Sequence, residues 1–269
     1  MTLITRPLSD PFGPVALRDV GAGAPLVLIH GVGMQSAAWT PQIEALSKTH
    51  RVIALDLPGH GGSAPLPAQS GLPVYVRWLD AVLDALELGP VALAGHSMGA
   101  LIAAGFAVTS PDRVSRVALV NGVYRRDQTA RDAVIARAAV IGEGAFDLDT
   151  PLDRWFSDSR ADQVARAQVA GWLSSVDIDG YAMAYRAFAH GDATYADRFA
   201  TIHCPLLALT GDEDANSTPA MARAMAKAAQ NGQAVIIDGH RHMVNLTAPE
   251  AVTNALRDWL ARPATGEIA

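Results

Sequence analysis

One serine in a glycine-rich pentapeptide is the residue of this sequence best placed to do chemistry. Ser97 stands in the pentapeptide 95–99 (Gly-His-Ser-Met-Gly), between an apolar run at 91–94 and a run of small residues at 100–108. In a turn between a strand and a helix, a serine can adopt a strained, positive-φ conformation that exposes its hydroxyl as a nucleophile. The same pattern also suits a serine that only caps a helix, so the motif alone leaves both interpretations open.

A nucleophilic serine needs a histidine as its base and a carboxylate that orients the histidine. Two later loops supply these side chains. The apolar run 206–209 leads into Asp212, Glu213 and Asp214, and the run 235–237 leads into a loop with two histidines, His240 and His242. The candidate residues follow one another along the chain in the order serine, acid, histidine. The residues alone do not decide which acid and which histidine take part.

The elements that must position these loops can be predicted from hydrophobic patterning. The expected strands are 26–29, 52–55, 91–94, 117–120, 206–209 and 235–237, and the expected helices are 37–47, 74–88, 98–109, 219–230 and 250–260. Continuous apolar runs are typical of strands that are buried on both faces of a parallel sheet, and the intervening segments are long enough for crossover helices. The pattern predicts a doubly wound α/β fold.

This alternation stops between about residues 121 and 200, where alanine-rich and mixed helical patterns replace the strands. We expect residues 122–199 to form a helical cap, inserted into a core made of residues 1–121 and 200–269. Large apolar side chains of the cap, such as Trp155, are mostly explained by packing of the cap on itself and on the core.

Composition narrows the classes of function. The chain has 269 residues, half of them hydrophobic, and a net charge of −6. Because no basic stripe is present, we expect a small-molecule partner and neither nucleic acid nor a membrane surface. No secretory signal or membrane span is apparent, which favours a cytoplasmic location. We expect no cofactor and no metal, since no His/Cys spacing suggests one, and a buried thiol at Cys204. The composition does not decide whether the chain forms a homo-oligomer.

Several motifs together resemble those of the α/β-hydrolase superfamily, over nearly the whole length of the chain. The segment 30–33 (His-Gly-Val-Gly) resembles the family's oxyanion loop, 56–63 resembles its D-x-x-G-x-G-x-S turn, and 95–99 resembles its nucleophile elbow. The resemblance implies an α/β-hydrolase fold with a mostly parallel sheet and an inserted helical cap after the sixth core strand.

The resemblance also implies which residues react. In related chains the acid falls three residues after a glycine, which selects Asp214, and the spacing of the histidine loop selects His242. Ser97 would then be acylated, with His242 as general base and Asp214 as the orienting acid. The backbone N–H groups of Val32 and Met98 would stabilise the oxyanion. Three further histidines are expected to support loop backbone: His30, His60 and His96.

A closer resemblance, to the 3-oxoadipate enol-lactonase group, lies in the segments 154–156, 179–181 and 217–219. It implies cleavage of an ester or of a carboxylate-bearing lactone. An anionic substrate would have Arg125 and Arg126 as natural partners, and Trp155 as a further contact. The same reactive residues also suit a carbon–carbon bond hydrolase of the meta-cleavage type or a cofactor-free perhydrolase. A hydrolase-like receptor with negligible turnover is the alternative from another class.

Overall fold

One sheet organises the molecule. The computed structural model describes residues 2–144 and 147–263, so Met1, residues 145–146 of the expected cap and residues 264–269 of the expected core lie outside this description. The eight-stranded sheet has the order β1-β2-β4-β3-β5-β6-β7-β8. The strands are β1 (Ile4–Arg6), β2 (Val15–Val20), β3 (Pro25–Ile29), β4 (Arg51–Leu55), β5 (Val91–His96), β6 (Val114–Val120), β7 (Leu206–Gly211) and β8 (Gly232–Ile237). β3 to β8 run parallel, whereas β1 and β2 pair antiparallel.

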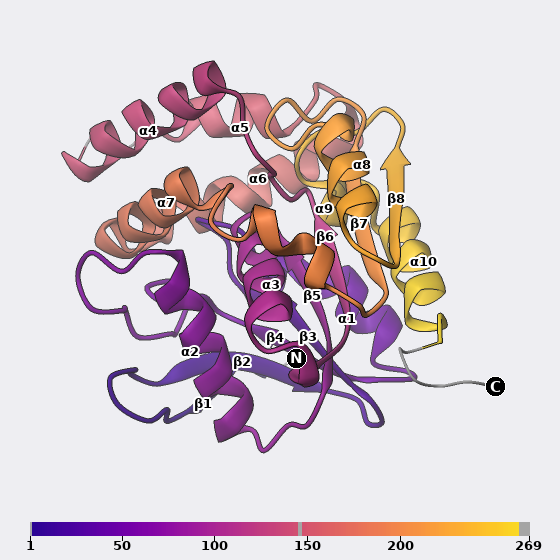
Figure 1. Ribbon diagram of the computed structural model, residues 1–269. Helices are drawn as coiled ribbons and strands as arrows, with labels where there is room; N and C mark the ends of the chain where they lie inside the picture. The colour runs from indigo at the N-terminus through magenta and orange to yellow at the C-terminus, as the bar shows by residue number, and fades with distance from the viewer. Residues whose placement is uncertain (1, 145–146, 264–269) are drawn as a thin grey trace.

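Helices cover both faces of this sheet (Figure 1). The longer helices are α1 (Thr40–Leu46), α2 (Leu72–Ala85), α3 (Met98–Thr109), α4 (Gln128–Gly142), α5 (Asp149–Trp155), α6 (Arg160–Ser175), α7 (Ile178–Gly191), α8 (Pro219–Ala228) and α10 (Pro249–Leu260). Short helical turns are η1 (Ser36–Trp39), η2 (Pro111–Arg113), η3 (Ala196–Thr201) and α9 (Val244–Thr247). In the part of the chain that the structure describes, no helix combines the length and the apolar character needed to cross a bilayer.

The expected α/β-hydrolase fold is confirmed, and all six strands predicted from apolar runs are present. Each predicted strand lies within a strand of the structure. The sequence patterns did not predict β1 and β2, because β1 is only three residues long and Arg18 and Asp19 interrupt the apolar run of β2. At the start of α8, the Thr218 hydroxyl accepts a hydrogen bond from the Met221 N–H, and Pro219 is the first residue of the helix.

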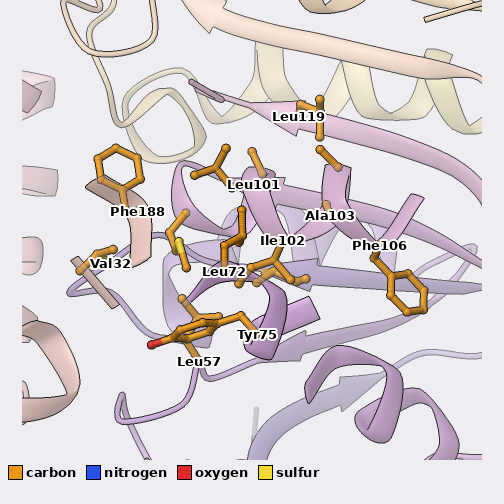
Figure 2. Close-up of a cluster of buried hydrophobic side chains, with 14 of the residues drawn as sticks. Val32, Leu57, Leu72, Tyr75, Leu101, Ile102, Ala103, Phe106, Leu119 and Phe188 are labelled. Atoms are coloured by element: carbon orange, nitrogen blue, oxygen red, sulfur yellow. The ribbon is translucent and has the colours of Figure 1, made fainter. Parts of the chain in front are cut away.

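The apolar runs supply two cores, one on each face of the sheet. Along β3, Leu26 and Leu28 face the core beneath α1 and α10, whereas Val27 and Ile29 face the core beneath α2, α3 and α8. This alternation is the period-two geometry of a strand, and burial on both faces explains why the run is continuously apolar. Figure 2 shows the second core, in which side chains of α3 pack between α2 and Leu119 of β6.

The helices α4 to α7 lie between β6 and β7 in the chain and gather at one end of the molecule (Figure 1). Two helices of this group pack on the core, because α7 contacts α2 and α3, and α6 contacts α9. Phe188 of α7 joins the apolar cluster around α3 (Figure 2). The four helices therefore cover the end of the sheet where β5 passes into α3.

Candidate active site

The turn between β5 and α3 presents Ser97 in the expected conformation. Its φ is +54° and its ψ is −111°, which is strained for a residue with a Cβ. Both glycines of the pentapeptide are required by close backbone contacts. A Cβ on Gly95 would collide with the carbonyl of Gly99, and a Cβ on Gly99 would collide with the carbonyl of Ile29. The local sequence thus fixes the sharp turn that exposes the hydroxyl.

This close packing leads to a prediction on stability. Replacing Gly95 by alanine should lower the free energy of unfolding by about 2–3 kcal/mol or more, because the added methyl meets rigid backbone. The measurement is urea unfolding followed by circular dichroism. Gly89→Ala is the matched control, since no heavy atom lies within 4 Å of its added Cβ. Equal stabilities of the two variants would contradict the packing argument.

Three side chains from three loops form a hydrogen-bonded series. The Ser97 Oγ lies 3.1 Å from Nε2 of His242, and Nδ1 of His242 lies 2.7 Å from Oδ2 of Asp214. All three residues are buried, with at most 7% of their surface exposed. Because a carboxylate accepts hydrogen bonds, Nδ1 of the neutral imidazole donates to Asp214 and leaves Nε2 free to accept the serine proton. This arrangement can activate a hydroxyl as a nucleophile.

Asp214 is held as a carboxylate by its surroundings. Its Oδ2 accepts a hydrogen bond from Nδ2 of Asn121, and its Oδ1 accepts from the N–H groups of Asn216 and Ser217. Burial alone would raise the pKa of Asp214. The charge and hydrogen bond of His242, together with these donors, outweigh burial and lower that pKa to about 2. The group therefore stays ionised at any pH at which the protein would normally be assayed.

The neighbouring carboxylates and the second histidine serve other contacts. Asp212 accepts a hydrogen bond from the Gly239 N–H, and Glu213 lies 3.7 Å from the Nε of Arg241. Nδ1 of His240 lies 3.0 Å from the Thr247 hydroxyl. The structure therefore brings Asp214 and His242 to the serine, and places Asp212, Glu213 and His240 in loop contacts.

The two expected oxyanion donors lie on either side of the serine. Met98 is the first residue of α3, so its N–H has no acceptor within the helix. Val32 lines the cavity in front of Ser97, and the preceding Gly31 approaches the serine so closely that an added Cβ would lie 3.0 Å from the Ser97 Cβ. Both N–H groups remain candidates for an oxyanion hole.

The three histidines in glycine-rich motifs support backbone, as predicted. The His30 Nε2 accepts a hydrogen bond from the Leu57 N–H, and the His60 Nε2 accepts one from the Gly33 N–H. The His96 Nε2 donates to the carbonyl of His242 at 2.9 Å, so it helps to position the histidine loop. Burial, followed by the charge of His242, lowers the pKa of His96 to about 3. His96 is therefore neutral in the working pH range.

A cavity of about 570 Å³ opens in front of the serine, and α4, α5 and α7 form its far wall. Trp155, the last residue of α5, lines the cavity and lies over the imidazole of His242, with the ring centroids 5.8 Å apart. Its predicted contact with substrate stays a prediction. Among the described residues, no group of three or more His, Cys, Asp or Glu side chains could hold a metal ion.

The two arginines expected to meet an anionic substrate, Arg125 and Arg126, have different surroundings. The Arg125 guanidinium is half exposed and pairs with Asp197 at 2.5 Å, and Arg125 is not among the described residues that line the cavity. Arg126 lines the cavity instead, with its side chain 3% exposed and paired with Asp192 at 3.3 Å. Of these two consecutive arginines only Arg126 lines the cavity, a difference that the sequence pattern could not predict.

Arg241 connects the histidine loop to the cap helix α5. The sequence patterns did not predict this contact. The Arg241 Nη1 donates to the carbonyls of Asp153 and Phe156, at 3.0 and 2.6 Å. These carbonyls lie at the carboxyl end of α5, where a cation is favourable. Because Trp155 stands between the two carbonyls, Arg241 fixes the residue that lies over His242.

Removing this connection should weaken catalysis without removing the nucleophile. We expect Arg241→Ala to lower kcat/KM for p-nitrophenyl acetate about tenfold, since hydrogen bonds from a charged donor contribute about 1.5–3 kcal/mol. Arg241→Lys, which keeps the charge and one donor, should lose less. Steady-state kinetics and thermal melting of the three proteins provide the measurement. Unchanged kcat/KM in Arg241→Ala would show that α5 needs no such restraint.

The fold and the site define a class of protein: an α/β enzyme with a buried, hydrogen-bonded Ser-His-Asp series below a helical cover. The family model described as "Alpha/beta hydrolase family" matches residues 26–255. The chain belongs to this family and is a hydrolase.

Three relatives are similar over most of their length. The (E)-2-((N-methylformamido)methylene)succinate hydrolase of Acinetobacter baylyi is 53% identical over 90% of this chain and 92% of its own. A solved malate-bound esterase from Thermogutta terrifontis is 28% identical, with a TM-score of 0.86 over 97% of this chain and 98% of its own. The enol-lactonase from Burkholderia xenovorans LB400 is 25% identical, with a TM-score of 0.85 over 96% of this chain and all of its own.

Proposed function

We propose that this chain hydrolyses an acyl bond of a small molecule through an acyl-enzyme on Ser97. The observation that carries the proposal is the buried hydrogen-bonded series of Ser97, His242 and Asp214 at the wall of the cavity. Such a series makes a hydroxyl nucleophilic at neutral pH, which a serine alone is not. A small-molecule substrate agrees with the volume of the cavity.

The reaction would proceed in two halves. Ser97 attacks the carbonyl carbon while the Nε2 of His242 takes the hydroxyl proton, and Asp214 stabilises the imidazolium that results. The developing oxyanion faces the N–H groups of Val32 and Met98. His242 then gives its proton to the leaving group, and a water activated by His242 releases the acid from Ser97. His96 holds the carbonyl of His242 throughout.

For the substrate we propose a compound of the kind named for the Acinetobacter relative, to which this chain is 53% identical. That compound is a succinate with one N-formyl amide. Attack on the formyl carbon would form a C–O bond to Ser97 and break the C–N bond, and the proton carried by His242 would pass to the nitrogen. Water would then release formate, so that the second product is 2-((methylamino)methylene)succinate.

A lactone is the second candidate, because the enol-lactonase from Burkholderia xenovorans matches nearly all of the chain at 25% identity. In that reaction the leaving group is an enol oxygen of the same molecule. The acyl-enzyme would keep both parts of the substrate until water opens the ester.

Product analysis distinguishes the two substrates. The purified protein is incubated with (E)-2-((N-methylformamido)methylene)succinate or with a carboxylate-bearing enol-lactone, and formate and ring opening are followed by NMR. The proposal predicts catalytic formate release by the wild type and none by Ser97→Ala. Turnover of the lactone alone would favour the second candidate. Turnover of neither compound would contradict both substrate assignments.

A further inference from the structure

The wall of the cavity opposite Ser97 carries two arginines on different cap helices. Arg137 projects from α4 and Arg154 from α5, and both line the cavity and are partly buried. The Arg137 Nη1 donates to the hydroxyl of Tyr185 on α7 at 3.0 Å, and Tyr185 stacks on Tyr181 with their centroids 5.9 Å apart. Three helices thus bring two guanidinium groups and two phenol rings to one region.

Neither of these two guanidinium groups is neutralised by the protein. Among the described residues no carboxylate lies within 4.0 Å of Arg137 or Arg154, whereas Arg126 in the same cavity is paired with the buried Asp192. Burial, and after it the charge of Arg137, lower the pKa of Arg154. The two positive charges therefore interact unfavourably across a partly apolar wall.

Two acidic residues, Asp127 and Asp147, also line the edge of the cavity, where solvent screens their charges. The carboxylate of Asp127 caps α4 by accepting the Ala130 N–H, and the carboxylate of Asp147 accepts the Asp149 N–H at the start of α5. Both carboxylates are exposed to solvent. The two partly buried guanidinium groups thus lack a carboxylate partner of their own, and an anionic ligand in the cavity would supply one.

We propose that Arg137 and Arg154 form a dicarboxylate-binding site that selects substrates with two carboxylates and holds their acyl bond against Ser97. A guanidinium offers two parallel donors that match one carboxylate, and the two arginines stand on different helices, so each serves one carboxylate. The role in catalysis rests on the proposed function, whereas the binding of a dicarboxylate does not require any turnover.

Calorimetry with succinate and butyrate tests the site without chemistry, since neither compound contains an acyl bond to cleave. Both have four carbons, and they differ by one carboxylate. Wild-type protein should bind succinate more tightly than butyrate. Arg137→Gln and Arg154→Gln should each weaken succinate binding about tenfold or more, and should bring the succinate and butyrate affinities together, because each variant removes one charged contact.

Arg186→Gln is the matched control, because Arg186 is an exposed arginine on the same helix as Tyr185. It should bind succinate as the wild type does. Arg154→Lys should recover part of the affinity, which a merely structural role of Arg154 would not predict. Thermal melting verifies that each variant is folded.

The inference would be overturned by no succinate binding of the wild type, by an equal loss in Arg186→Gln, or by unchanged succinate affinity in either cavity variant. Tighter binding of inorganic phosphate than of succinate would also overturn it, since it would assign the arginines to a phosphate group. Arginine-dependent succinate binding in a protein that hydrolyses nothing would leave the dicarboxylate site standing and remove only the proposed function.

Discussion

Ser97→Ala should lower kcat for p-nitrophenyl acetate by about 10⁵- to 10⁶-fold, because it removes the only group that the proposed mechanism acylates. Oxyanion donors and the cavity remain in the variant, so a small residual rate over water is expected. The assay is release of p-nitrophenolate, measured with enough protein to detect the residual rate.

The melting temperature of Ser97→Ala is the control, because it shows whether the variant is folded. Alanine is smaller than serine, and the positive φ of residue 97 is fixed by the surrounding glycines, so the melting temperature should stay close to that of the wild type. A folded Ser97→Ala protein with a rate within tenfold of the wild type would show that another group attacks the ester.

Asp214→Asn should lower kcat about 10⁴-fold, the second largest effect that we expect. In the wild type, the Nδ1–H of His242 donates to the Asp214 carboxylate at 2.7 Å. The asparagine amide of the variant can instead direct its own N–H toward the imidazole. The imidazole would then take the tautomer in which Nε2 carries the proton and cannot accept one from Ser97. Steady-state kinetics on the same ester give the comparison.

The pH dependence of this variant follows from the same contact. Since the pKa of Asp214 is about 2, protonation of Asp214 does not limit the wild type above pH 4. Removing its negative charge destabilises the protonated imidazole, so the acid limb of the pH–rate profile should move to lower pH in Asp214→Asn. Asp238→Asn, which changes an exposed carboxylate of the histidine loop, should leave rate and profile unchanged. An acid limb that moves to higher pH would contradict the assigned contact.

Much of the fold could be predicted because strands that are buried on both faces of a sheet are apolar at every position. Runs such as 26–29 and 206–209 are apolar at every position, and each became a buried parallel strand. The edge strand β1 has only three residues and is largely exposed, and the second half of its neighbour β2 is only partly buried, so neither strand carries such a signal. Helix ends were predicted to within a few residues, and both ends of α3 and the start of α8 were predicted correctly.

The reactive residues could be found because turns with positive φ or close backbone contacts require glycine, and glycines mark the elbow and the later loops. The cap offered no comparable signal. Arg125 and Arg126 are identical in type and adjacent, and only the three-dimensional path of the chain decides which one faces the cavity. The positions of Asn121, Arg137 and Arg154 around the site were also not predicted, since they depend on partners that lie far away in the sequence.

Covalent labelling of Ser97 tests the central claim most directly. A fluorophosphonate forms a stable adduct with an activated serine, and trypsin should place the label in the peptide 78–113, which contains Ser97. The account predicts one label on Ser97 per chain, with loss of ester hydrolysis in proportion to labelling and very slow labelling of Asp214→Asn. Full activity in protein whose Ser97 is completely labelled, or a label on a different residue that tracks the loss of activity, would contradict it.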